Sequence, residues 1–277
     1  MLTNKKLKEG EIMIVDCHTH LDFSLGDKQN PAYECPNLFK LLNAMKRTGV
    51  DKVGLIHSPV PDNEYFFWRE KDIIRAAERT LDIISKYPDK FFTLLWLNPI
   101  LPAEFNIKMI ERYIVNGPID GVKLHIQMNT RDKRMEPLAE AIQAHGIPVL
   151  IHAWYKTVQK YKYECDPSDI ADLASRFPEM KILMAHLTGC RKRGVQDIKK
   201  YKNIWIDTAG SQAEDGFLEY AIDELGADRI LFGSDFDIRD IATQLGRIYS
   251  VDMDDKTREK ILSGNALKFF TKGGVKA

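Results

Sequence analysis

The chain has 277 residues, with 40 lysines and arginines against 40 aspartates and glutamates, and 44% of its residues are hydrophobic. This length suffices for a large buried core and corresponds to one large domain or two small ones. The formal net charge of zero argues against nucleic acid as a main partner, because binding to phosphate backbones needs a basic surface. We therefore expect a small-molecule partner, recognised at a local site.

Four cysteines are spread along the chain: Cys17, Cys35, Cys165 and Cys190. They form no CxxC pair, which argues against a zinc ribbon or a disulfide scaffold and favours a reduced compartment. No apolar stretch with a cleavage site follows the basic amino terminus, and the most apolar stretch, residues 91–101, is too short to cross a bilayer. We expect a cytoplasmic protein that does not enter a membrane; a homo-oligomer is compatible with the sequence.

Short apolar runs alternate with longer segments along the whole chain. The runs are Ile12–Cys17, Lys52–His57, Phe91–Leu97, Gly121–His125, Pro148–His152, Lys181–His186, Asn203–Asp207 and Arg229–Gly233. They are nearly continuous in apolar residues, as is typical of strands covered on both faces of a parallel sheet. Between two of them, Glu70–Lys86 carries an apolar stripe at helical spacing and ends before Pro88, which predicts a crossover helix.

This repeated strand and helix unit predicts the fold. Eight units in roughly 250 residues fit a (β/α)8, or TIM, barrel. A doubly wound open sheet alternates in the same way, but it usually has a glycine-rich turn after the first strand, where this chain has DCHTH at residues 16–20. No linker marks a second domain. We expect one domain over residues 1–277, with the barrel starting near residue 12 and a helical tail, about residues 254–271, packed on it.

Most of the histidines lie at or just beyond the carboxyl end of a predicted strand. These are His18, His20, His57, His125, His152 and His186. Asp235 follows the eighth strand in the same way. Because the carboxyl ends of the strands carry the catalytic loops of a TIM barrel, we expect these side chains to meet at one mouth.

His18 and His20 are two residues apart, so both point to the same side of an extended segment. With His152 and Asp235 they form a donor set suited to a divalent ion, which we expect to be Zn²⁺, with Mn²⁺ or another divalent ion as the alternative. For the pair alone, the other interpretation is one core and one surface histidine. His186 is open between a further ligand, a general acid or base, and a hydrogen-bonded histidine of the core.

Lys123 shares the inward face of its strand with His125. It could carry a carboxylated amine between two metals, pair with Asp235 or Asp16, bind an anionic substrate, or form a salt bridge inside the barrel. Its role is therefore open, and we count it and His186 as metal ligands only for a binuclear site.

Four residues are candidates for substrate binding: His125, Trp154, Arg191 and Arg193. The two arginines lie near an expected helix amino terminus, where positive charge is unfavourable. Anion recognition would explain that cost; a solvated basic loop is the alternative. The aromatic stretch Tyr65–Trp68, together with Trp154, is expected to wall an apolar pocket or form a lid, or to pack between helix and barrel.

Several motifs together resemble the amidohydrolase superfamily. They are DCHTH, GVKLH, PVLIHA, ILMAHLTG, IWIDTAG, RILFGSDF and ILSGNALKFF, in that order. The chain most resembles the amidohydrolase-related group of TIM-barrel metal-dependent hydrolases, which also contains aminocarboxymuconate-semialdehyde decarboxylase and resorcylate decarboxylases. The resemblance extends from about Ile12 to Phe270.

The resemblance implies roles for individual residues. It implies four metal ligands: His18, His20, His152 and Asp235. It further implies that Asp235 takes the proton from the attacking water and that His186 polarises the substrate or ligates a second metal. Lys123 occupies the strand on which binuclear members carry a bridging carboxylated lysine.

The predicted site suggests a reaction. A divalent ion lowers the pKa of bound water from about 15.7 towards about 7 and polarises a carbonyl group. Asp235 would accept the proton of that water, and His186 would stabilise the oxyanion of the tetrahedral intermediate. We predict a metal-dependent hydrolase of an amide, ester or lactone. The alternatives are a non-oxidative decarboxylase or other lyase that uses the same site on a small carboxylic acid, and a barrel that binds metal or ligand without catalysis.

Overall fold

A computed structural model describes residues 12–21, 36–58, 68–158, 160–212 and 214–271 of the chain. In these residues, eight strands form one sheet in the order β1 to β8, and every pair of neighbours is parallel. The strands are β1 (Val15–Leu21), β2 (Lys52–His57), β3 (Phe91–Trp96), β4 (Gly121–Leu124), β5 (Val149–Ile151), β6 (Ile182–Met184), β7 (Ile204–Asp207) and β8 (Ile230–Leu231).

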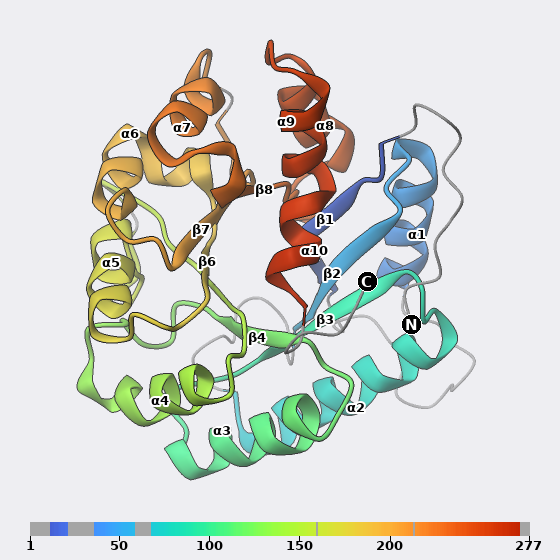
Figure 1. The fold of residues 1–277 in the computed structure, drawn as a ribbon. Coiled ribbons are helices and arrows are strands. Elements are labelled where there is room, and N and C mark those ends of the chain that lie inside the picture. Colours follow the sequence, from blue (N-terminus) through green and yellow to red (C-terminus); the bar gives the residue numbers. More distant parts are fainter. Residues whose placement is uncertain (1–11, 22–35, 59–67, 159, 213, 272–277) are drawn as a thin grey trace.

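Helices connect the strands and lie outside them (Figure 1). The α-helices are α1 (Pro36–Thr48), α2 (Glu70–Lys86), α3 (Ala103–Ile110), α4 (Glu136–Ala144), α5 (Pro167–Arg176), α6 (Leu187–Ile198), α7 (Phe217–Leu225), α8 (Ile241–Tyr249), α9 (Asp255–Glu259) and α10 (Asn265–Phe269). Shorter helical segments are η2 (Glu111–Val115), η3 (Lys133–Met135), η4 (Ala227–Arg229) and η5 (Lys260–Gly264). The predicted helix over Glu70–Lys86 is observed with the same bounds.

The sheet closes on itself between its last and first strands. The backbone N–H of Cys17 donates to the carbonyl of Phe232 at 2.9 Å, and the N–H of Asp235 donates to the carbonyl of His18 at 2.7 Å. A doubly wound open sheet has no such contacts between its edge strands. The prediction of a (β/α)8 barrel is therefore confirmed.

The strands are buried on both faces, as their apolar runs predict. In β5, Leu150 packs inside the barrel in one cluster with Leu94 and Leu183. Its neighbours Val149 and Ile151 belong to the larger cluster between strands and helices. Because successive side chains of a strand alternate, this packing determines which residues at the carboxyl ends face the barrel axis.

The carboxyl-terminal helices pack on the barrel, as predicted. The Phe270 ring lies 4.5 Å from Phe92 of β3, and the Phe269 ring lies 5.1 Å from Trp205 of β7. Both partners stand near the start of their strands, on different sides of the barrel. Residues 265–271 therefore cover the amino-terminal end of the barrel and leave the carboxyl end accessible.

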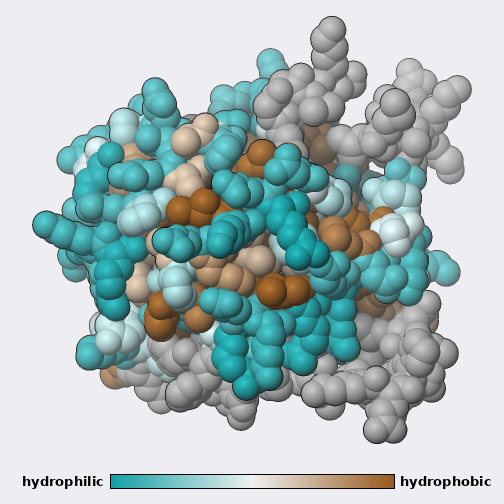
Figure 2. Space-filling view, turned by 90° about the horizontal axis from the view of Figure 1, so that it is seen from below, coloured by the Kyte–Doolittle hydropathy of each residue, from teal (hydrophilic) through white to brown (hydrophobic). Residues whose placement is uncertain are grey.

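The surface shows no single large apolar face in the view of Figure 2, where hydrophobic residues form small separate patches among hydrophilic ones. Among the described residues, no helix is both long enough and apolar enough to cross a membrane. Scattered hydrophobic residues of this kind are normal on a folded protein.

Candidate active site

Strand β1 carries the predicted histidine pair, His18 and His20, and a β-bulge determines the direction of their side chains. The pairing of β1 with β2 shifts register between Asp16 and Thr19. Cys17, within the shifted stretch, packs inside the barrel, and an extra residue in a strand turns the following side chains to the other face. His18 and His20 therefore also point to the barrel axis. The predicted strand ended at Cys17, whereas β1 continues through both histidines.

His18, His20 and Asp235 form the candidate metal centre. His18 Nε2 lies 3.1 Å from His20 Nε2 and 3.5 Å from Asp235 Oδ1, and His20 Nε2 lies 3.3 Å from the same oxygen. One ligand atom from each residue lies within 4.8 Å of the others. Although burial acts to raise it, the neighbouring histidines hold the pKa of Asp235 well below its usual range. Two imidazoles facing one ionised carboxylate fit a divalent cation by donor chemistry.

His186 is brought to this centre by an unusual backbone conformation. Ala185 packs inside the barrel, so simple alternation would turn His186 towards the outer helices. Instead His186 has φ 72° and ψ 67° and precedes α6. Its Nε2 lies 3.7 Å from Asp235 Oδ2, and its ring stacks on His18 with centroids 5.3 Å apart. His186 therefore lies within ion-pair distance of Asp235, beside the metal ligands.

Asp207, at the end of β7, is a buried partner of two site histidines and was not among the predicted site residues. Its Oδ2 lies 2.8 Å from His18 Nδ1, and its Oδ1 accepts from the backbone N–H groups of His186 at 2.8 Å and Ala209 at 3.0 Å. Although burial acts to raise it, these contacts hold the pKa of Asp207 below its usual value. A carboxylate on Nδ1 fixes the tautomer of His18 and leaves Nε2 free for a metal. In the sequence, the position of this aspartate at the end of the apolar run NIWID is the one feature that could have indicated it.

Lys123 and His125 lie on the floor and wall of the same site. Lys123 Nζ is 3.3 Å from His18 Nε2, and burial lowers the pKa of this lysine to about 8. The His125 ring lies edge-on to Trp96 at 5.2 Å and to His152 at 4.7 Å. Burial also lowers the pKa of His125 well below its usual value, which favours the neutral imidazole.

His152 lies at the mouth but is held by a residue of the following loop. Its Nε2 is 2.8 Å from Glu164 Oε1, and the Lys156 amine lies 2.8 Å from the same oxygen. Although burial acts to raise it, these two partners lower the pKa of Glu164 to about 2. The group of converging ligand atoms among the described residues does not include His152. The structure thus places this predicted ligand beside the centre, and Glu164 is a further residue that the sequence analysis did not select.

Replacing Glu164 by glutamine is expected to lower the free energy of unfolding by about 2 kcal/mol at neutral pH, because buried charge-assisted hydrogen bonds are lost. The folded-state pKa of about 2 lies below the ordinary 4.5, so this stabilisation is present above pH 4.5 and lost as the pH falls towards 2. Urea unfolding at several pH values checks this. The difference between wild type and variant should shrink in that window.

The matched control is Glu224→Gln, since Glu224 also accepts from two partners, Gln196 and Lys199, but near the surface. We expect little change from it at any pH. Equal destabilisation by both variants would contradict the structural role assigned to Glu164.

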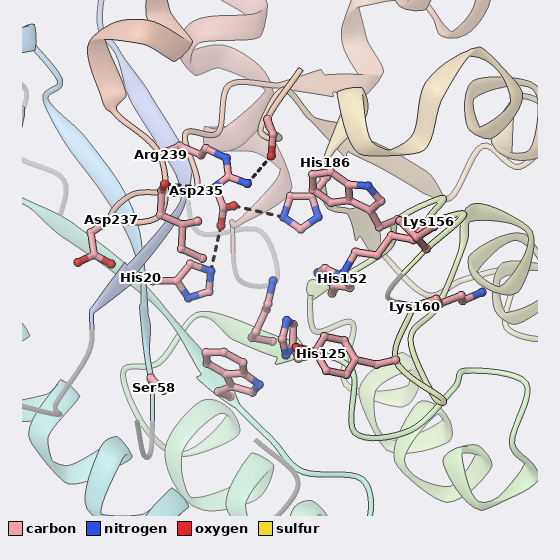
Figure 3. A pocket seen from close by; sticks show the side chains of 17 residues that line it. His20, Ser58, His125, His152, Lys156, Lys160, His186, Asp235, Asp237 and Arg239 are labelled. Atoms are coloured by element: carbon pink, nitrogen blue, oxygen red, sulfur yellow. Dashed lines mark hydrogen bonds and ion pairs between the residues drawn. The ribbon is translucent and has the colours of Figure 1, made fainter. Parts of the chain in front are cut away.

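A cavity of about 810 Å³ opens above these residues at the carboxyl end of the barrel (Figure 3). The residues that line it include His20, Trp96, Lys123, His125, His152, Trp154, Lys156, Lys160, His186, Ser211, Asp235, Asp237 and Arg239. Trp96 and Trp154 give it aromatic walls, as expected for Trp154. The stretch Tyr65–Phe67 lies outside the described residues, and Trp68 is buried edge-on against Trp96 at 4.6 Å.

Arg191 and Arg193 do not lie in this lining. Both are exposed on α6, and the Arg193 guanidinium packs over the Tyr155 ring at 4.8 Å. The reason is local: the chain turns at Arg191, with φ 57°, just after the buried Cys190. Both arginines are thus solvent-exposed outside the cavity lining, and their role in substrate binding stays a prediction. Cations from other loops line the cavity instead.

The fold and the site define a TIM-barrel protein with a candidate metal centre at the carboxyl end of its strands. The chain belongs to the amidohydrolase family, whose sequence model matches residues 15–272. The resemblance drawn from its motifs is therefore confirmed.

Solved structures with the same fold include several decarboxylases. The chain is 16% identical to 5-carboxyvanillate decarboxylase from Sphingomonas paucimobilis, with a TM-score of 0.72, covering 94% of this chain and 99% of that one. Dihydroxybenzoic acid decarboxylase from Polaromonas, solved with manganese and 2-nitroresorcinol, is 16% identical at a TM-score of 0.71, covering 94% and 97%. A putative amidohydrolase from Staphylococcus aureus is 16% identical at a TM-score of 0.74, covering 94% and 99%. At 16% identity, these matches establish that this chain shares the fold of those proteins.

Proposed function

We propose that the protein is a metal-dependent lyase that removes carbon dioxide, without oxidation, from a small carboxylic acid. The observation that carries the proposal is the position of Asp235, which faces His18 and His20 with one oxygen and His186 with the other. Asp235 would thus both bind the metal and act with His186 in proton transfer. The decarboxylases among the solved relatives support this reaction over the acyl hydrolysis predicted from the sequence.

His18, His20 and Asp235 are the residues proposed to hold the divalent ion. When bound, the ion supplies a positive charge that holds substrate oxygen atoms and withdraws electron density from the reacting carbon. Zn²⁺ remains the expectation from the donor set, and the manganese in a relative makes Mn²⁺ the other ion to test.

In the proposed reaction the bond between the carboxylate carbon and its neighbour breaks. Carbon dioxide leaves, the electron pair stays on the neighbouring carbon, and that carbon takes up a proton. In this proposal His186, which lies 3.7 Å from the Asp235 carboxylate, delivers that proton. Trp96 and Trp154 line the cavity with flat apolar surfaces that suit an aromatic ring and exclude water from it.

The experiment that tests this function compares carbon dioxide release with acid release. Protein reconstituted with Zn²⁺ or Mn²⁺ is supplied with a panel of hydroxybenzoic acids, and in parallel with esters, lactones and amides. Carbon dioxide release that chelation abolishes and metal restores supports the lyase. Acid release from the second group, with no carbon dioxide from the first, would favour the hydrolase. No turnover of either group by metal-loaded protein would favour a binding protein.

Replacing His186 by glutamine is expected to lower kcat by about 10²- to 10⁴-fold with a smaller effect on KM, because the proton-transfer partner of Asp235 is lost. Steady-state kinetics of the reconstituted protein checks this. The control is His145→Gln, an exposed histidine that follows α4. Unchanged kcat in the His186 variant would remove it from the proposed proton transfer.

A further inference from the structure

A tryptophan of the loop after β5 forms one aromatic wall of the cavity and is held against α6. The centroid of the Trp154 ring lies 5.1 Å from that of His186. The backbone N–H of Tyr155 donates to the carbonyl of Gly189 at 3.0 Å, and His186 Nδ1 lies 3.4 Å from the carbonyl of Ala153. Because these contacts flank Trp154 in the chain, they place its ring against the first turn of α6.

Gly189, in that turn, leaves the space that the indole occupies. A Cβ atom added to Gly189 would lie 2.6 Å from Cδ2, 2.7 Å from Cε3 and 2.8 Å from Cε2 of Trp154. Non-bonded carbon atoms pack at about 3.5 to 4.0 Å, so even a methyl group at this position requires the indole to move. The backbone of Gly189 is not left-handed, and glycine is unfavourable inside a helix. The packing of Trp154 therefore accounts for a glycine here.

The first turn of α6 has no room to retreat from the indole. Leu187 and Cys190, on either side of Gly189, are buried in the core between the strands and the outer helices. The other side of the indole faces the open cavity. A side chain added at Gly189 therefore displaces Trp154 into the cavity, towards the space beside His186.

We propose that Gly189 is a positioning residue that sets the size of the space beside His186, and that this space accepts one aromatic ring of the substrate. Gly189 does not line the cavity and acts through Trp154. The second aromatic wall is also fixed, because Trp96 packs edge-on against the buried Trp68 at 4.6 Å. The inference rests on the proposed function, in which the acidic group of the substrate lies at the metal centre.

Calorimetric titration of the metal-loaded protein with benzoate and with acetate tests this assignment. Wild type should bind benzoate at least about 10-fold more tightly than acetate, the factor that burial of part of an aromatic ring supplies. Gly189→Ala should lower benzoate affinity by about 10-fold and acetate affinity by less than about 3-fold, because the displaced indole overlaps only the ring. In a Trp154→Phe protein the same substitution should have a much smaller effect, since the smaller ring leaves room for the methyl group.

The matched control is Gly194→Ala in the same helix. A Cβ atom there would also be crowded, at 2.7 Å from Pro167 Cγ and from Cys190 Cβ, but Gly194 does not contact the cavity wall. This variant should unfold at a lower temperature and keep the preference for benzoate.

Four results would overturn the proposal: an unchanged preference in Gly189→Ala, equal loss of both acids, the same effect with Phe at position 154, or no binding of benzoate to wild type at millimolar concentration. If Gly189→Ala does not fold, Trp154→Phe alone decides. It should bind 2-naphthoate at least about 10-fold more tightly than wild type, since the smaller wall residue enlarges the space. Unchanged affinity would also overturn the proposal. The readout is binding, so it fails or succeeds independently of carbon dioxide release.

Discussion

Replacing Asp235 by asparagine is expected to lower kcat by about 10²- to 10⁴-fold, the range for loss of a positioned proton-transfer group. The reason is that one carboxylate serves two functions: Oδ1 faces His18 and His20, and Oδ2 faces His186 at 3.7 Å. An amide has nearly the same shape but no negative charge. The variant should therefore bind metal more weakly and lose the ion pair with His186. Kinetics and metal content of the reconstituted protein measure both effects.

The neighbouring Asp237 provides the control for this substitution. It also lines the cavity, but its carboxylate pairs with the exposed Lys40 at 3.4 Å. Asp237→Asn should leave metal content and kcat within a few fold of wild type. If Asp235→Asn kept full activity, or if both variants lost it equally, the assignment of Asp235 would be wrong.

Replacing Asp207 by asparagine is expected to weaken metal binding by about 10- to 100-fold, the usual cost of losing the carboxylate behind a ligating histidine. The fully buried Asp207 accepts from His18 Nδ1 and from the backbone of His186. An asparagine that still accepts from His186 presents its amide to His18. That amide favours the tautomer with hydrogen on Nε2, which cannot ligate a metal.

Two readouts separate this positioning role from a purely structural one. Metal affinity is measured by titration at a temperature where the variant is folded, and thermal unfolding of the metal-free protein is measured in parallel. Nitrogen NMR of the histidine rings should show the changed tautomer of His18. A variant with lower unfolding temperature but unchanged metal affinity and unchanged tautomer would show that Asp207 only supports the fold.

The barrel could be predicted from the sequence because its signals are local. Continuous apolar runs mark strands covered on both faces, and proline and glycine mark the connections, so Glu70–Lys86 was predicted to the residue. The extent of β1 was predicted less well. The polar DCHTH segment resembles a loop, yet the closure of the barrel pairs it on both sides and keeps it extended.

The site was predictable as a set of residues but not as a geometry. The bulge that turns His18 inward and the positive φ of His186 are features of the closed barrel. The spacing of residues in the sequence does not predict them. Asp207 is far from His18 in the sequence and Glu164 lies in the loop after His152, so only the fold shows which histidine each one orients. Charge alone did not predict where Arg191 lies, because a basic cluster next to a strand end can face solvent.

Calorimetric titration of metal-free protein with Zn²⁺ and with Mn²⁺ tests the proposed metal centre most directly. Wild type should bind one ion per chain at His18, His20 and Asp235, and His18→Ala should abolish saturable binding while the fold is retained. Wild type that binds no stoichiometric ion, or a His18→Ala protein that binds as tightly as wild type, would contradict a metal-dependent enzyme built on these residues.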